Sequence, residues 1–281
     1  MLIFNHKEGL RVHLSDVKSR NSTIGFVPTM GALHKGHLSL LEKSVADNDV
    51  TVISIFVNPT QFNNPDDLHK YPRTLEADTE KIALVSDKII IFAPSVEEMY
   101  DGNTTSSHFS FDGLEHQMEG SHRPGHFDGV GTIVKKLFEI VMPDKAYFGE
   151  KDFQQLQIVK KLVEKTGLPI TIIGCPISRE ENGLAMSSRN ERLSAADKVK
   201  AAFIYKTLTE AQEHFKTESI EDVKHYVEHA FARHPEFSLD YFEIASEDDL
   251  KPATLKEKRK YRAFIAVFLS DVRLIDNISL N

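Results

Sequence analysis

The chain has 281 residues, of which 41% are hydrophobic and 27% charged, and its net charge is −8. This composition is typical of a globular protein of about two domains, and it excludes a fibrous repeat or an extensively disordered chain. The acidic balance argues against a general nucleic-acid-binding protein, whose surface needs an excess of Lys and Arg. An anionic ligand therefore has to be bound by a local site.

Cysteine content and hydropathy indicate the cellular compartment in which the protein is expected. Cys175 is the single cysteine, which excludes an internal disulfide, and its apolar neighbours predict a strand residue rather than a nucleophile. The first residues carry no signal-peptide pattern, and no apolar run reaches the length of a membrane span. We expect a cytoplasmic protein that contacts neither membrane nor nucleic acid.

Short apolar runs alternate with amphipathic helical patterns over the first 176 residues. The run at residues 50–57, VTVISIFV, is typical of a parallel strand buried on both faces. Further strands are expected at residues 24–27, 88–92 and 170–174, and helices at residues 36–46, 74–85, 129–141 and 152–166. This alternation predicts an α/β fold with a Rossmann-like, doubly wound parallel sheet, whose ligands bind beyond the carboxyl ends of the strands.

The pattern changes near Pro176. Two amphipathic helices are expected at residues 195–215 and 220–231, and strands at residues 239–245, 261–269 and 272–278. Helices followed by strands predict a small α+β module. We therefore expect a first domain at residues 1–176 and a smaller second domain at residues 177–281.

Two histidines follow the first predicted strand, in the segment TMGALHKGH. His34 and His37 have i, i+3 spacing, which places both imidazoles on one face of the first turn of a helix that begins near Gly36. Free N–H groups and the positive end of the helix dipole favour an anion there, so the segment predicts a phosphate site. Such a pair alone is more often solvated on a helix, and the phosphate interpretation depends on the matching segments downstream.

The segment FVNPTQF leads from a predicted strand into a polar turn. Asn58 and Gln61 each offer a donor and an acceptor, which suits a small substrate with hydroxyl and carboxylate groups, although Asn-Pro alone indicates only a turn. Thr74 is expected to be the N-cap of the next helix. In the loop SHRPGHFDG, Arg123 could bind a carboxylate or a phosphate, and a surface loop with scattered charge is equally consistent with the pattern.

Two further segments are rich in cations and hydroxyls. In FGEKDFQQ, Lys151 is a candidate phosphate cation, Asp152 a candidate ribose or metal partner, and Gln155 faces the same side one turn on. The alternative for Asp152 is a favourable charge at a helix start. In AMSSRN, two hydroxyls followed by Arg189 could close over phosphates, and the alternative is a helix-capping Ser-Ser.

Together these segments resemble the pantothenate synthetase family, the pantoate–β-alanine ligases of the H-x-G-H nucleotidyltransferase superfamily. The resemblance covers nearly the whole chain and is specific, because H-x-G-H occurs here with FVNPTQF, RPGHF, FGEKDFQQL and MSSRN. The chain departs from the family at Asp101, where Pro is usual, and at Ser270, where Gly is frequent. Both positions lie outside the motifs.

The resemblance implies a Rossmann-like nucleotide- and pantoate-binding domain, a C-terminal lid domain, a homodimer, and ATP with Mg²⁺. It implies that (R)-pantoate attacks ATP to form pantoyl adenylate and pyrophosphate, and that β-alanine then displaces AMP. Gln61 and Gln155 would bind pantoate, and Gln61 would also bind β-alanine. From their own donor chemistry, rather than from the resemblance, Asn58 and Arg123 are further candidates for binding the substrate. The implied nucleotide site comprises Met30, Gly31, Ala32, Leu33, His34, Lys35, Gly36, His37, Gly149, Glu150, Lys151, Asp152, Ser178, Met186, Ser187, Ser188 and Arg189.

The chemistry suggests how the implied catalytic residues act. An attacking carboxylate has no proton to lose, so the first step needs charge stabilisation and in-line positioning. We therefore interpret His34, His37, Lys151 and Arg189 as stabilisers of developing negative charge, although the family describes the residue at position 37 as a proton donor. No protein cluster for a metal is expected.

Two other functions are compatible with parts of the pattern. One is a different adenylyl- or cytidylyltransferase on the same fold, against which only Asn58, Gln61 and Gln155 argue. The other is a non-catalytic nucleotide-binding module, which predicts the loss of some motif members, whereas all are present here. The ligase hypothesis requires that His34, His37, Arg189 and the two glutamines share one cleft.

Overall fold

Short, mostly apolar segments within the first 176 residues form a six-stranded, all-parallel sheet in the order β1-β4-β3-β2-β5-β6. The computed structural model describes residues 1–281. The strands are β1 (Leu2–Phe4), β2 (Ile24–Thr29), β3 (Val50–Ile55), β4 (Ile90–Phe92), β5 (Lys145–Gly149) and β6 (Thr171–Cys175). The predicted doubly wound α/β fold is thus confirmed.

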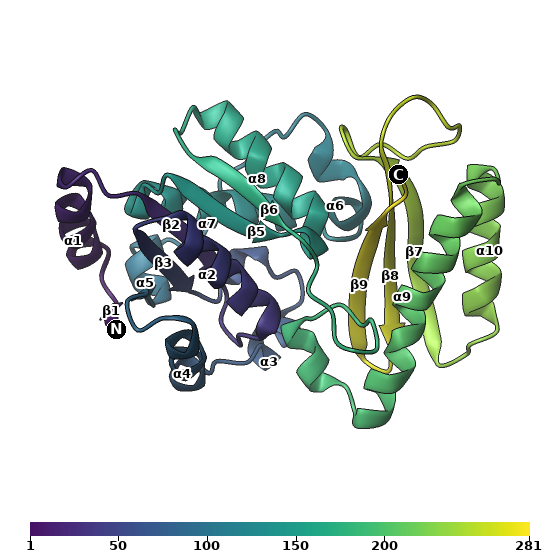
Figure 1. Cartoon of the computed structure of the whole chain (residues 1–281), viewed down its shortest axis with the longest axis horizontal. Coiled ribbons are helices and arrows are strands. Elements are labelled where there is room, and N and C mark those ends of the chain that lie inside the picture. The colour runs from purple at the N-terminus through teal and green to yellow at the C-terminus, as the bar shows by residue number, and fades with distance from the viewer. The chain divides into compact units, whose positions relative to one another are not determined.

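Helices cover both faces of this sheet (Figure 1). The helices within residues 1–176 are α1 (Lys7–Ser19), α2 (Lys35–Asp47), α3 (Pro65–Lys70), α4 (Leu75–Val85), α5 (Val96–Tyr100), α6 (Met118–His122), α7 (His126–Val141) and α8 (Phe153–Thr166). Side chains of β2 alternate between two cores, as strand geometry requires. Val27 packs with Leu41 of α2, whereas Phe26 meets Phe138 of α7 edge-on, with ring centroids 6.2 Å apart.

Strand order reverses at β2, which pairs with β3 on one side and with β5 on the other. In parallel sheets of this kind, the crevice beyond the carboxyl ends at such a reversal is the usual ligand site. The segment after β2 contains both motif histidines, and the segment after β5 begins at Glu150. The topology therefore predicts a ligand site at the carboxyl ends of β2 and β5.

The chain divides into two compact units. The N-terminal unit comprises Met1–Glu115, Glu119–Glu150 and Gln154–Pro176, and the C-terminal unit comprises His116–Met118, Lys151–Phe153 and Ile177–Asn281. The turn that contains Lys151 is therefore grouped with the C-terminal unit, although it directly follows β5.

The C-terminal unit is built on an antiparallel sheet, β7 (Phe237–Ser246), β8 (Tyr261–Leu269) and β9 (Val272–Ser279). Helices α9 (Ala195–Phe215) and α10 (Ile220–Ala232) lie side by side against one face of it (Figure 1). Ile265 of β8 and Leu274 of β9 belong to the core under these helices. Ser270, in the β8–β9 turn, has a φ of 56°, the left-handed conformation that glycine adopts most easily.

The predicted elements at residues 195–215 and 261–269 agree with α9 and β8, and most other predicted ends are shifted by a few residues. No element was predicted for the first 23 residues, where the structure has β1 and α1. Strand β1 has only three residues at a sheet edge, too few to show a period. No helix in the described chain is both long and apolar enough to cross a membrane.

Candidate functional site

The turn after β2 has an unusual backbone conformation. Gly31 has a φ of 82° and Ala32 a φ of 50°, so two successive residues lie in the left-handed region. Thr29 starts the turn: its Oγ1 accepts a hydrogen bond from the N–H of Gly31 at 3.2 Å and donates to the carbonyl of Ser54 at 2.7 Å. A non-glycine residue such as Ala32 keeps a positive φ only where surrounding contacts hold it there.

Those contacts come from α4. The carboxylate of Asp78 accepts hydrogen bonds from the N–H groups of Ala32, at 2.9 Å, and Leu33, at 2.7 Å. Lys81 donates to the carbonyl of Leu33 at 2.6 Å. Asp78 is fully buried, and a buried carboxylate persists where N–H donors satisfy its oxygens.

Sequence reasoning missed Asp78, although a signal exists. Asp78 precedes the buried Ile82 by four residues, so a carboxylate lies on the buried face of α4. Thr74 occupies the N-cap position as predicted, but its side chain makes no capping bond to a backbone N–H. Its hydroxyl instead donates to Asp78 at 3.2 Å.

The two histidines cap helix α2. The helix begins at Lys35, so His34 is its N-cap residue rather than a member of its first turn. His34 Nδ1 accepts from the N–H of Gly36 at 3.2 Å, and His37 Nδ1 accepts from the N–H of His34 at 3.4 Å. The ring centroids are 4.0 Å apart. Because both Nδ1 atoms accept, each neutral ring carries its proton on Nε2 and can donate from that atom.

The predicted substrate residues after β3 form one connected group. Asn58 is the N-cap residue of the short 3₁₀ helix η1 (Pro59–Gln61), and Gln61 is its last residue. Asn58 Nδ2 donates to Gln61 Oε1 at 3.2 Å, and Gln61 Nε2 donates to the sulfur of Met30 at 3.0 Å. Asn58 is only 1% exposed. These bonds bring the polar turn after β3 to the turn after β2.

Tyr100 sets the orientation of the Asn58 amide. Its hydroxyl donates to Asn58 Oδ1 at 2.5 Å, so that Nδ2 points toward Gln61 and toward the carbonyl of Gly129, 3.2 Å away. Burial raises the pKa of Tyr100 above its ordinary value, which keeps the hydroxyl protonated at neutral pH. Sequence reasoning did not single out Tyr100 as a partner of Asn58.

Arg123 and the start of α7 hold the main chain of Gln61. Arg123 Nη2 donates to the Gln61 carbonyl at 3.3 Å, and His126 Nδ1 donates to the same carbonyl at 2.8 Å. Arg123 Nη1 lies 3.7 Å from the carboxylate of Glu119. Gly129 permits the close approach, since a Cβ there would lie 2.4 Å from the carbonyl oxygen of Thr60. Arg123 therefore fixes the main chain of Gln61 by a hydrogen bond to its carbonyl.

The segment after β5 forms the 3₁₀ helix η3 (Glu150–Asp152). Lys151 Nζ lies 3.8 Å from the carboxylate of Asp152, whose side chain is half exposed. Gln155 is half-buried on the first turn of α8, the helix predicted for it. Cys175 is the last residue of β6, as predicted, and burial raises the pKa of its thiol, which makes it a poor nucleophile.

A tight hairpin brings together the predicted nucleotide residues of the C-terminal unit. The N–H of Met186 donates to the Ser178 carbonyl at 3.0 Å. Ser187 caps the 3₁₀ helix η4 (Ser188–Arg192) by accepting from the N–H of Arg189, so the capping interpretation of the first serine is correct. Asn190 Nδ2 donates to the Ala185 carbonyl at 3.0 Å and closes the loop.

The predicted site residues thus form two groups. His34, His37, Met30, Gln61, Asn58, Arg123 and Gln155 belong to the N-terminal unit, and Lys151, Asp152, Ser178 and residues 186–189 belong to the C-terminal unit. Within each unit the structure links most of these residues by hydrogen bonds. The cleft shared by the histidines, the glutamines and Arg189 stays a prediction, since its members come from both units.

Comparisons with known proteins agree over the full length. The family model for pantoate-beta-alanine ligase matches residues 2–279. Proteins named pantothenate synthetase from Flavobacterium psychrophilum and Christiangramia forsetii are 60% and 54% identical, and each alignment covers 100% of both chains.

Solved structures are also similar. The pantothenate synthetase of Thermus thermophilus is 39% identical with a TM-score of 0.92, and the alignment covers 100% of this chain and 99% of that one. The pantoate-beta-alanine ligase of Francisella tularensis, in a complex with beta-gamma ATP and beta-alanine, is 34% identical with a TM-score of 0.81 and is covered to 98%.

Replacing Asp78 should loosen the turn after β2. In Asp78→Ala the N–H groups of Ala32 and Leu33 lose their buried acceptor, so we expect faster hydrogen exchange at both amides and a free energy of unfolding lower by about 2 kcal/mol or more. Hydrogen exchange and denaturant unfolding measure the two effects. Asp87→Ala, at an exposed carboxylate after the same helix, is the control. Unchanged protection at both amides would contradict the assigned role.

Adding a methyl group at Gly129 should displace η1. In Gly129→Ala the new Cβ would lie 2.8 Å from Gln61 Cα, so we expect a free energy of unfolding lower by about 1–3 kcal/mol, from overpacking, and a shifted Gln61. Thermal unfolding and a crystal structure of the variant test this. Gly9→Ala is the matched control, because its Cβ meets Phe4 at an ordinary 3.4 Å. A variant of wild-type stability with η1 in place would refute the packing argument.

Proposed function

Since the chain belongs to the pantoate-beta-alanine ligase family, we propose that it condenses (R)-pantoate with β-alanine through a pantoyl-adenylate intermediate, releasing AMP and pyrophosphate. The observation that carries the proposal is the turn after β2. There a histidine-capped helix N-terminus lies beside the reversal of strand order, where nucleotides bind in such sheets.

In the first step a pantoate carboxylate oxygen attacks the α-phosphorus of ATP. The new O–P bond forms as the bond from the α-phosphorus to the bridging oxygen breaks, and pyrophosphate leaves with the electron pair. The carboxylate arrives without a proton, so this step requires stabilisation of negative charge. The Nε2–H groups of His34 and His37 are suited to this task, because their Nδ1 atoms are occupied by backbone donors.

Cations of the C-terminal unit complete the proposed nucleotide site. We assign Lys151 and Arg189 to the phosphates, joined by residues 149–152, by Ser187 and Ser188, and by the backbone at Ser178. The hydrogen bond between Ser178 and Met186 supports this assignment, since it holds both segments of the hairpin together. Arginine and lysine are suited to phosphate oxygens, the first as a planar fork and the second as a point charge.

We assign pantoate to Gln61 and Gln155, and β-alanine to Gln61. Asn58 and Arg123 act on the same site through Gln61: the first bonds its amide and the second its carbonyl. An amide oriented in this way offers its groups in a fixed direction, which favours one substrate pose. In the second step the β-alanine ammonium first loses a proton to solvent, and the neutral amine then attacks the acyl carbon. The bond from that carbon to the adenylate oxygen breaks, AMP leaves with the electron pair, and the nitrogen gives a second proton to solvent as the amide forms.

We also propose that ATP binds with Mg²⁺. Magnesium in nucleotide sites is held mainly by phosphate oxygens, with one or two protein carboxylates. The half-exposed carboxylate of Asp152, beside Lys151, fits that donor set. When bound, Mg²⁺ would neutralise charge on the departing pyrophosphate. From the family we further infer a homodimer in the cytoplasm, where the single buried Cys175 needs no partner.

Loss of one imidazole donor should slow adenylate formation. We expect His37→Ala to reduce the rate of pantoate-dependent AMP formation by about a hundredfold or more, as removal of one preorganised transition-state donor does. Coupled detection of AMP measures the rate. His229→Ala, at an exposed histidine of α10, is the control and should retain the wild-type rate. A His37→Ala protein as fast as wild type would refute the assignment.

Substrate choice separates the ligase from other nucleotidyltransferases. With a panel of hydroxy acids plus β-alanine, we expect pyrophosphate release from ATP to be fastest with pantoate, because we assign its hydroxyl and carboxylate groups to the amides of Gln61 and Gln155. Phosphate-coupled detection of pyrophosphate provides the measurement. Faster release with an unrelated acid would favour a different transferase, and ATP binding without any release would favour a non-catalytic module.

A further inference from the structure

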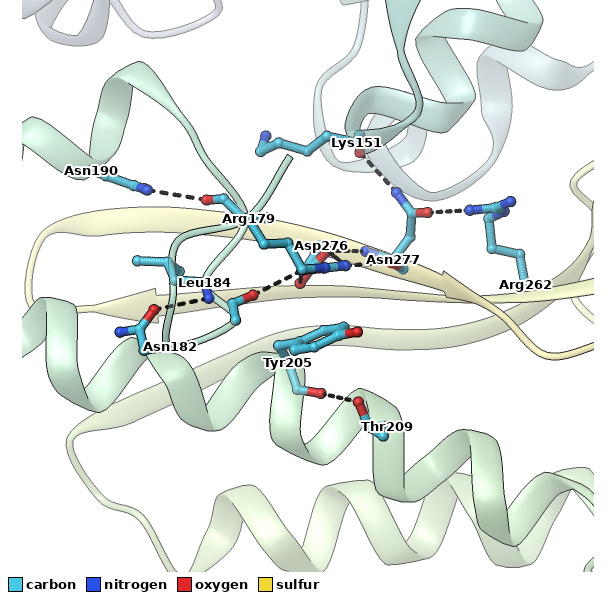
Figure 2. A network of polar contacts seen from close by, with 12 residues as sticks. Lys151, Arg179, Asn182, Leu184, Asn190, Tyr205, Thr209, Arg262, Asp276 and Asn277 are labelled. Atoms are coloured by element: carbon cyan, nitrogen blue, oxygen red, sulfur yellow. Dashed lines mark hydrogen bonds and ion pairs between the residues drawn. The ribbon is translucent and has the colours of Figure 1, made fainter. Parts of the chain in front are cut away.

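Two adjacent residues of β9 connect separate parts of the C-terminal unit. Asp276 and Asn277 are 5% and 1% exposed. As neighbours on a strand their side chains point to opposite faces of the sheet. Figure 2 shows that Asp276 meets Arg179 on one face, whereas Asn277 lies between Lys151 and Arg262 on the other.

Asn277 holds the turn that carries Lys151. Its Nδ2 donates to the Lys151 carbonyl at 2.9 Å, and its Oδ1 accepts from Arg262 Nη1 at 2.7 Å. Since arginine only donates, the amide can satisfy both partners in one orientation alone. The Arg262 guanidinium also lies 4.0 Å from the ring centroid of Phe153. The Lys151 turn is therefore held at two points: by the hydrogen bond to its carbonyl within η3, and by stacking of Arg262 on Phe153 directly after η3.

Asp276 holds the hairpin that carries Ser178 and Met186. Its carboxylate accepts hydrogen bonds from both terminal nitrogens of Arg179, Nη1 at 2.6 Å and Nη2 at 3.0 Å. Arg179 donates further to the Gly183 carbonyl at 3.1 Å, and its guanidinium lies 3.7 Å from the ring centroid of Tyr205. Burial raises the pKa of Asp276, and Arg179 opposes that shift. A bidentate buried pair of this kind has little freedom to tilt.

We propose that Asp276 and Asn277 are positioning residues that hold the two cation-bearing segments, the Lys151 turn and the Ser178–Arg189 hairpin, at one fixed spacing. This inference rests on the proposed function, because it concerns the phosphate site formed by Lys151 and Arg189. Because Asp276 and Asn277 are consecutive residues of one strand, the two segments that they bond keep a constant separation from each other. A preorganised pair of cations stabilises charge in the transition state without first being ordered.

The experiment isolates the bond to Lys151. In Asn277→Asp the carboxylate still accepts from Arg262, but no donor faces the Lys151 carbonyl. We expect kcat for pantoate-dependent exchange of pyrophosphate into ATP to fall about tenfold, while KM for pantoate changes less than twofold. In a Lys151→Ala background the same substitution should reduce the rate less than twofold further, because the group it positions has been removed.

Asn281→Ala is the matched control, since the Asn281 amide likewise donates to a main-chain carbonyl, that of Tyr261, at 3.0 Å. It should leave kcat unchanged. If Asn277→Asp does not fold, Arg262→Lys supplies the same cycle, because lysine lacks the planar fork that contacts Asn277 and Phe153. The expected loss for that variant is severalfold in the wild-type background and less than twofold in the Lys151→Ala background.

Two results would overturn the proposal: a wild-type kcat in Asn277→Asp, or losses that multiply fully with that of Lys151→Ala, as a general structural defect predicts. Both presuppose a wild-type protein that exchanges pyrophosphate with pantoate. A wild-type protein without that exchange would instead overturn the proposed function.

Discussion

The turn between β2 and α2 keeps its shape because the buried carboxylate of Asp78 accepts hydrogen bonds from the N–H groups of Ala32 and Leu33. Without that acceptor two buried N–H groups would be unsatisfied and a left-handed alanine unsupported. This turn also determines where α2 begins, and therefore where His34 and His37 lie. A single carboxylate of α4 thus sets the geometry of the histidine pair.

The two units position their candidate groups by different means. In the N-terminal unit, strand ends and a helix N-terminus present main-chain N–H groups and imidazoles. In the C-terminal unit, Lys151 and the hairpin at residues 178–189 depend on side chains of one strand, Asp276 and Asn277. Both arrangements tie the candidate groups to buried hydrogen-bond partners and so restrict their local motion, which is the requirement for electrostatic preorganisation.

Several polar residues near the candidate site act through a neighbour. Tyr100 orients Asn58, which orients Gln61, and Arg123 holds the main chain of Gln61. Asn58 and Arg123 were candidates for direct substrate binding on the basis of donor chemistry alone. The structure adds protein partners for both, and these partners explain why amide and guanidinium groups occur in those segments.

The sequence alone determined the class of fold, most of the helices and strands, and the motifs that identify the family. These properties are local: hydrophobic period, strand composition and residues a few positions apart are all visible along the chain. The roles of Asp78 and Asn277 were decided by the tertiary structure. Asp78 bonds the amide of a residue 46 positions away, and Asn277 a carbonyl 126 positions away. No local pattern encodes such pairs, because only the packing of α4 beneath the β2 turn, and of β9 beside the Lys151 turn, brings donor and acceptor together.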